Sequence, residues 1–172
     1  MIAPIPGAMF VTRHPPVNKL IIFDLTNGGF MPLQVNPKEI KDSWGATWED
    51  SEVSGVSHPR QQYARGGPRI LRFTAPFYLE YDYTDVRRRC QWLLSLLVPT
   101  HAGVMIDRPP AVCALVMGGL LRGFRATLRQ ADVTYKEVFD PIMLMPLWAE
   151  VECVWHEWVE RSIGPMEVRS WI

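Results

Sequence analysis

Hydrophobic and polar residues alternate in two long stretches of the chain, as they do in strands that bury one face. In residues 69–83 the apolar residues occupy every second position from Leu71 to Tyr81, and mostly polar or charged residues stand between them. Residues 145–158 show the same alternation, with an apolar face that runs from Leu147 to Trp155. Both patterns predict long strands in an antiparallel sheet that covers a core on one side.

Shorter apolar runs predict further strands at residues 19–25, 30–35, about 45–53, 112–117 and 120–129. Asn27-Gly28-Gly29 is a turn signal between the first two of them. In the last, Leu120, Phe124, Ala126 and Leu128 are expected to point inward. Residues 54–68 contain two prolines and three glycines, which predicts a long loop.

One helix is expected, at about residues 84–97. Thr84 is suited to cap its N-terminus, with Asp85 in the first turn. An apolar stripe at helical spacing follows, and Pro99 ends the helix. One helix beside about seven strands predicts a mainly β protein, an antiparallel β-barrel or sandwich with the helix packed against it.

The domain organisation follows from the ends of this pattern. Residues 1–18 contain four of the chain's prolines and have no clear period, which indicates an extended arm or a disordered tail. Residues 19–160 form the β domain, and residues 161–172 are a short C-terminal tail. Because the arm includes several apolar residues, docking on a neighbouring subunit is the favoured interpretation.

Composition narrows the function classes. The chain has 172 residues, 48% of them hydrophobic, which fits one globular domain. Lys plus Arg and Asp plus Glu are both 18, and this zero net charge argues against sequence-specific nucleic-acid binding. The longest apolar stretch, residues 111–121, is too short for a span of about 20 residues. Three widely spaced cysteines indicate a reducing compartment, not a disulfide scaffold.

No motif for catalysis or cofactor binding is found in the sequence. None of the four histidines has the spacing of a metal site, and neither a nucleophile elbow nor a phosphate-binding loop is present. His156 and Glu157 are adjacent in a predicted strand and therefore point to opposite faces. We expect no catalytic residue, metal or cofactor, and no enzymatic activity.

Arginines and tryptophans are the candidates for subunit contacts. Arg87-Arg88-Arg89 is the strongest charge run, and its alternative interpretation is a solvated helix face. Trp148 falls on the outward face of its strand, where a tryptophan indicates an anchor residue. The candidate interface residues are Met9, Phe10, Pro15, Pro16, His58, Arg60, Arg65, Arg87, Arg88, Arg89 and Trp148.

Several motifs, in this order, resemble a known family. They are Phe30 to Ile40, Leu71 to Tyr81 with Thr84 to Arg87, Arg108-Pro109-Pro110 with Val116 to Gly118, Leu121 to Phe124, and Thr134 to Asp140 with Pro146 to Val151. Together they cover roughly residues 20–157 and resemble the tube-like N-terminal domain of baseplate proteins from phage tails and related contractile injection systems. A LysM module follows this domain in many members and is not expected here.

The resemblance implies a structural role in a virion, after assembly in the host cytoplasm. Such a protein would form a homo-oligomeric ring, often six-fold, between the spike hub and the tail tube, with the tube, hub and baseplate wedge proteins as partners. Two alternatives stay open. One is a monomeric β-barrel that binds a small apolar ligand inside. The other is a hydrolytic tail enzyme, which needs an acid–base pair that the spacing does not provide.

Overall fold

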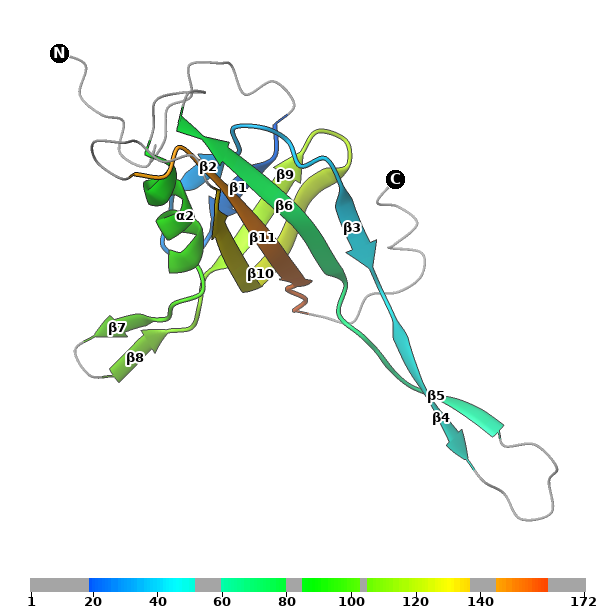
Figure 1. The fold of residues 1–172 in the computed structure, drawn as a ribbon. Coiled ribbons are helices and arrows are strands. Elements are labelled where there is room, and N and C mark those ends of the chain that lie inside the picture. Colours follow the sequence, from blue (N-terminus) through cyan, green and yellow to red (C-terminus); the bar gives the residue numbers. More distant parts are fainter. Residues whose placement is uncertain (1–18, 52–59, 80–84, 103–104, 137–144, 161–172) are drawn as a thin grey trace.

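The computed structural model describes residues 19–51, 60–79, 85–102, 105–136 and 145–160, and Figure 1 shows their arrangement. One sheet forms the body, the helix α2 lies beside it, and two hairpins project from it. The elements are β1 (Ile21–Asp24), β2 (Phe30–Pro32), β3 (Ile40–Ser43), β4 (Ala46–Ser51), β5 (Arg60–Gly66), β6 (Ile70–Tyr78), α2 (Val86–Ser95), β7 (Thr100–Ala102), β8 (Met105–Arg108), β9 (Val112–Met117), β10 (Leu121–Tyr135) and β11 (Trp148–Glu157).

The body is a seven-stranded antiparallel sheet in the order β2-β1-β9-β10-β11-β6-β3. The predicted class, mainly β with one helix against the sheet, is confirmed. In the described residues β2 and β3 are the edge strands of an open sheet, with no ladder between them. Pro32 lies in β2, as expected for a residue that has no N–H to donate to a further strand.

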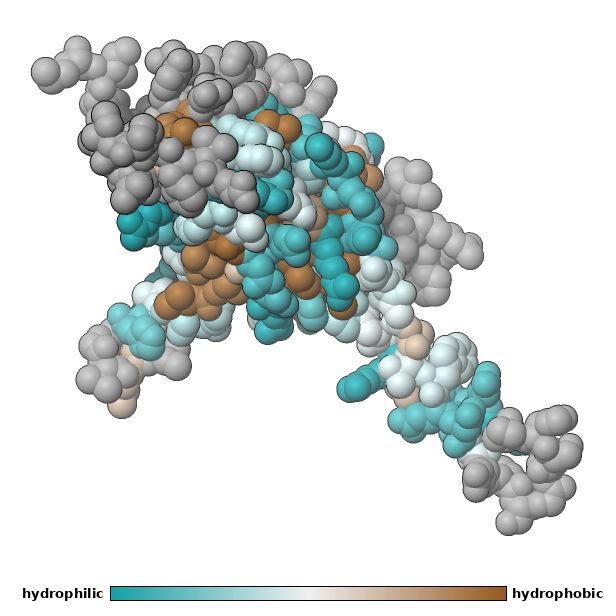
Figure 2. All heavy atoms as spheres, in the orientation of Figure 1, coloured by the Kyte–Doolittle hydropathy of each residue, from teal (hydrophilic) through white to brown (hydrophobic). Residues whose placement is uncertain are grey.

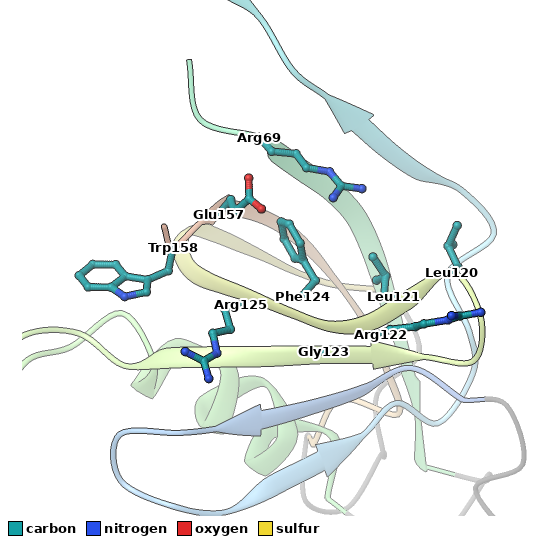
Figure 3. Close-up of a pocket in the computed structure, with 9 residues that line it drawn as sticks. All are labelled: Arg69, Leu120, Leu121, Arg122, Gly123, Phe124, Arg125, Glu157 and Trp158. Carbon is teal, nitrogen blue, oxygen red and sulfur yellow. The ribbon is translucent and has the colours of Figure 1, made fainter. Parts of the chain in front are cut away.

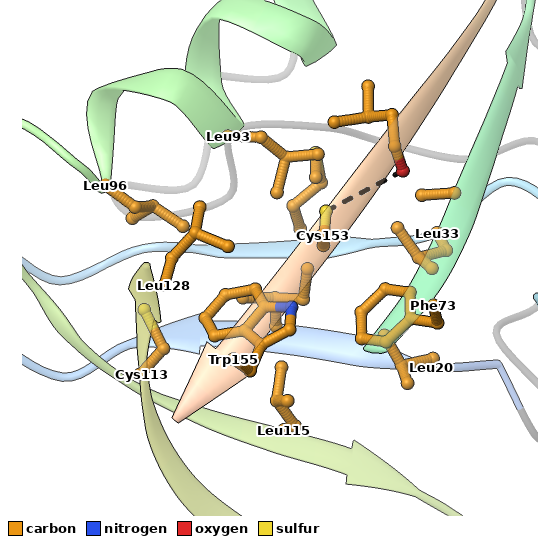
Figure 4. Close-up of a cluster of buried hydrophobic side chains, with 14 of the residues drawn as sticks. Leu20, Leu33, Phe73, Leu93, Leu96, Cys113, Leu115, Leu128, Cys153 and Trp155 are labelled. Atoms are coloured by element: carbon orange, nitrogen blue, oxygen red, sulfur yellow. Dashed lines mark hydrogen bonds between the residues drawn. The ribbon is translucent and has the colours of Figure 1, made fainter. Parts of the chain in front are cut away.

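The core lies between one face of the sheet and α2, whose contacts are with β11, β10 and β6. The alternation predicted for the two longest strands is confirmed, since the inward residues of β6 from Leu71 to Phe77 and of β11 from Ala149 to Trp155 are buried. Trp155 is fully buried and stacks on Phe73 with ring centroids 6.4 Å apart. Figure 4 shows these rings among leucines from α2, β9 and β10.

The helix is shorter than the sequence predicted and is capped by another residue. Asp85, not Thr84, is the N-cap, and its carboxylate accepts a hydrogen bond of 2.9 Å from the backbone N–H of Arg87. This bond satisfies one of the free N–H groups of the first turn. Thr84 lies outside the described residues.

Strand β10 extends six residues beyond its expected end and contains two register shifts against its neighbours. One lies between Arg122 and Phe124, where Gly123 has a φ of +80°, a conformation that L side chains rarely adopt. Leu120, predicted to point inward, is 67% exposed because it belongs to the turn before the strand.

The prediction of a long loop at residues 54–68 is wrong for residues 60–66, which form β5 and pair with β4. Residues 54–59 lie outside the described residues. Because β3 pairs with β6 as well, the two chain segments form one long ribbon that leaves the body as a hairpin (Figure 1). Two hydrogen bonds join its two segments between these ladders: Gly67 N–H donates to Gly45 O at 2.8 Å, and the Trp44 indole donates to Gly67 O at 2.9 Å.

Candidate functional site

The most exposed part of the described chain is the β4–β5 hairpin, in which every residue of β5 is exposed. Trp48 and Tyr63 are cross-strand partners, each 59% exposed, and their rings meet edge to face with centroids 5.6 Å apart. An aromatic pair of this kind stabilises a hairpin, but here it leaves most of both rings in water. On Figure 2 the hairpin is teal to pale, and the darkest brown lies on the body.

The register assigns different charges to the two faces of this hairpin. Trp48 and Asp50 share one face with Tyr63 and Gln61, because these are directly opposed pairs and alternate residues share a face. The opposite face includes Glu49 and Arg60, and the register shift between Thr47 and Trp48 pairs Arg65 with Thr47 on that face as well. The aromatic face therefore carries one negative charge, that of Asp50.

A groove of about 350 Å³ lies at the end of the sheet, between the start of β10, the end of β11 and the residue before β6. Figure 3 shows Leu120 and Trp158 at its two ends, with Phe124 between them and Arg69 above the ring. The guanidinium carbon of Arg69 is 5.1 Å from the centroid of Phe124. The lining residues are Arg69, Leu120, Leu121, Arg122, Gly123, Phe124, Arg125, Glu157 and Trp158.

The lining of the groove contains three arginines and one glutamate, Glu157, whose pKa is raised, mainly by burial and against the lowering effect of Arg69. Arg69 is held by Asp42 through hydrogen bonds from Nε of 2.9 and 3.1 Å, and this partner raises the pKa of the guanidinium. Arg125 lies 3.8 Å from Glu160, and both side chains are mostly exposed. Asp42 and Glu160 therefore offset two of the three positive charges, and Arg122 is the exposed arginine of the lining that a negatively charged group can reach.

The predicted arginines are separated by the structure. Arg60 and Arg65 lie exposed on the β4–β5 hairpin, and Arg87 and Arg88 lie exposed on α2. Arg89 was predicted at the interface but is fully buried on the core side of α2, so it does not present its charge at the surface. Helical spacing places it in the apolar stripe, one residue before Cys90.

Trp148 lies half-buried on the outward face of β11, the face that the alternation predicted. Its ring stacks on Tyr78 with centroids 5.5 Å apart, and the ammonium of Lys136 lies 5.6 Å from its centroid. The other predicted interface residues, Met9, Phe10, Pro15, Pro16 and His58, lie outside the described residues.

Other chemistry has little support in the described part of the chain. It contains no group of three His, Cys, Asp or Glu placed to hold a metal ion. Cys90, Cys113 and Cys153 are buried free thiols, and burial raises the pKa of each of them. The aromatic residues of the inward faces fill the core, as Phe73 and Trp155 do in Figure 4. Among the described residues no helix is long and apolar enough to cross a membrane.

The sequence did not indicate that the groove residues form a site. Leu120 and Phe124 were expected in the core, Leu121 to Phe124 was one of the motifs of the resemblance, and Glu157 was considered only beside His156. The available signal was Arg122-Gly123-Phe124-Arg125, where a glycine interrupts an alternating strand between two arginines. What the sequence could not show is that β6, β10 and β11 bring these side chains to the same end of the sheet.

Comparisons with known proteins give distant structural similarity only. No family model and no curated protein matches the sequence. Among solved structures, a similar chain belongs to the tail of an empty GTA particle, computed with helical refinement and C6 symmetry. The two chains are 16% identical, the match covers 88% of this chain and 98% of that one, and the TM-score is 0.39. A similarity this distant assigns neither a family nor a function.

Proposed function

We propose that this protein is a structural component of the tail of a phage or a phage-like contractile particle. In this role it forms a ring in the baseplate that joins the central spike hub to the tail tube. The proposal rests on the ordered motifs that resemble tube-like baseplate domains, from Phe30 to Val151, and on a fold of the expected class.

The observation that carries the proposal is the unused pairing capacity of the described fold. Among the described residues the exposed edge strand β3 has one side without a ladder, and the β4–β5 hairpin extends two more strands into solvent. Exposed edges promote pairing with other chains, and an isolated two-stranded hairpin is only marginally stable in water. A ring of identical subunits would cover such edges and hold such hairpins.

The proposed role is geometric and includes neither catalysis nor a cofactor. Its partners would be further copies of this chain, the tail tube protein, the spike hub and the baseplate wedges. The protein would be found in the virion after assembly in the host cytoplasm. The β4–β5 hairpin, the exposed arginines of α2 and the β7–β8 hairpin are the surfaces that the described residues offer for these contacts.

Particle localisation tests the proposal. An epitope tag at the N-terminus is introduced in the producing strain, and purified particles are stained with gold-labelled antibody. Gold at the end of the tail that bears the spike is expected, together with tails that fail to form when the gene is deleted. Tails that assemble normally without the protein would contradict a structural role, and binding of an apolar dye by a lone monomer would then favour the ligand-binding alternative.

A further inference from the structure

We propose that the aromatic face of the β4–β5 hairpin of one copy docks in the groove at the sheet end of a second copy. This inference rests on the proposed function only for the claim that the chain assembles with itself. It names the two surfaces that meet: Trp48, Tyr63 and Asp50 on one copy, and the groove around Phe124 on the next.

The hairpin side of this contact has the features of an interface anchor. Trp48 and Tyr63 are more than half exposed. Tryptophan and tyrosine often contribute much of the binding energy when an interface buries them, so this exposed pair is suited to anchor a contact. Both project from one face of a narrow ribbon, so a partner can enclose them on the free side. Asp50, two residues after Trp48 on the same face, adds a negative charge beside the rings.

The groove side offers space, apolar ends and arginine side chains. A volume of about 350 Å³ falls within the range of roughly 300–1,000 Å³ typical of binding pockets. Leu120 and Trp158, 67% and 43% exposed, give it apolar ends, and Arg122 and Arg125 border it on exposed positions of β10. Guanidinium groups pair with carboxylates and stack on aromatic rings, so these arginines suit both Asp50 and the two rings.

The two surfaces do not meet within one molecule. The ribbon of β3–β4 and β5–β6 leaves the sheet at the end where the groove lies and directs the hairpin away from the body (Figure 1). At the base of the ribbon the Arg69 side chain donates to Asp42, and the backbone N–H of Gly67 donates to Gly45 O. A second copy is therefore the occupant that brings Trp48, Tyr63 and Asp50 to the groove that Arg122 and Arg125 border.

Such a contact is heterologous, because different patches of the same chain meet. Each copy then has one free hairpin and one free groove, and further copies add until a ring closes or a filament grows. This property allows a test that does not depend on knowing the number of subunits.

The test uses two variants of the full chain, each with one surface removed. The hairpin variant carries Trp48→Ala and Asp50→Arg, and the groove variant carries Arg122→Glu and Arg125→Glu. All four side chains are exposed, so both variants are expected to keep the wild-type circular dichroism spectrum. Light scattering with size exclusion is expected to give oligomers for the wild type and a weakening of at least about 30-fold for each variant alone.

Mixing the two variants gives the deciding result. Each mixed pair retains one intact hairpin and one intact groove, so a 1:1 dimer that cannot grow is expected. The matched controls are Glu49→Arg, on the opposite face of the same hairpin, and Lys38→Glu with Arg129→Glu, which reverses two exposed charges away from the proposed contact surfaces. The controls are expected to assemble as the wild type does.

Three outcomes would overturn the inference. They are a wild-type chain that stays monomeric up to about 0.5 mM, variants that assemble normally, and a mixture that forms no dimer. If removal of residues 161–172 abolishes assembly while the hairpin variant still assembles, that segment and not the hairpin occupies the groove. Gold labelling of particles is scored separately, so a tail protein with a different self-contact is distinguished from a protein that is absent from tails.

Discussion

A buried glutamine joins the segment after the edge strand β2 to the end of β6, and its removal should destabilise the protein strongly. Gln34 follows the edge strand β2 and is fully buried. Its side-chain amide donates to the backbone C=O of Tyr78 at 2.9 Å and accepts from the backbone N–H of Tyr78 at 2.7 Å. Tyr78 is the last residue of β6, beyond the part of that strand that β3 pairs, so the glutamine takes the place of a neighbouring strand.

The magnitude follows from the two bonds. In Gln34→Ala both are lost, at about 1 kcal/mol each, and the peptide groups of Tyr78 are left without these partners in a partly buried place. The loss of unfolding free energy is therefore about 3 kcal/mol, and about 2–4 kcal/mol is the working range. For a chain of this length such a loss lowers Tm by about 6–12 °C.

Urea unfolding followed by tryptophan fluorescence measures this loss. The matched control is Gln62→Ala on the exposed strand β5, for which the free energy of unfolding should change by less than about 0.5 kcal/mol. Gln34→Glu separates the two bonds, since a carboxylate keeps the acceptor for Tyr78 N–H but offers no donor to Tyr78 C=O. Its deficit should shrink at low pH, where the protonated carboxyl donates again. A Gln34→Ala change of under about 0.5 kcal/mol would refute the view that this amide joins the two segments.

Three further predictions concern the N-cap residue Asp85, the positive φ of Gly123 and the three buried thiols. Asp85→Ala should lower the unfolding free energy by about 1 kcal/mol in the same urea assay, because the N-cap bond is lost. Gly123→Ala should cost about 1 kcal/mol through its positive φ alone, since an added Cβ meets no atom within 4 Å. Burial raises the pKa of Cys90 from 9.0 to about 11 and that of Cys113 and Cys153 to about 12. Above about pH 9 the unfolded chain releases thiol protons that the folded chain keeps, so the free energy of unfolding should fall as the pH rises. In Cys113→Ala this fall should be smaller. Ellman's reagent should label the thiols only after unfolding.

Local patterns were sufficient for the core strands. The alternation in residues 69–83 and 145–158 identified β6 and β11 and their buried faces, because a period of two requires one side of a strand to face the core. The same reasoning found α2, but it read Arg89 as part of a surface charge run. Its position in the apolar stripe was the better guide, because helix geometry and not residue type decides which face is buried.

The sequence was a weaker guide in residues 54–68, where glycine and proline obscured the strand β5. That strand exists because β4 lies beside it and satisfies its backbone, and pairing of this kind leaves little trace in residue type. The predicted loop therefore became half of a hairpin whose aromatic face is exposed.

The sequence by itself determined that this chain is a mainly β protein with one amphipathic helix, since hydrophobic period and turn residues are local properties. Only the tertiary structure decided that Gln34 reaches Tyr78 at the end of β6, and that Arg69, Phe124 and Glu157 share one groove. These groups come from strands far apart in the chain, and their meeting depends on the strand order and register. The physical reason is that pairing between distant strands is set by the packing of the whole sheet, which no local pattern records.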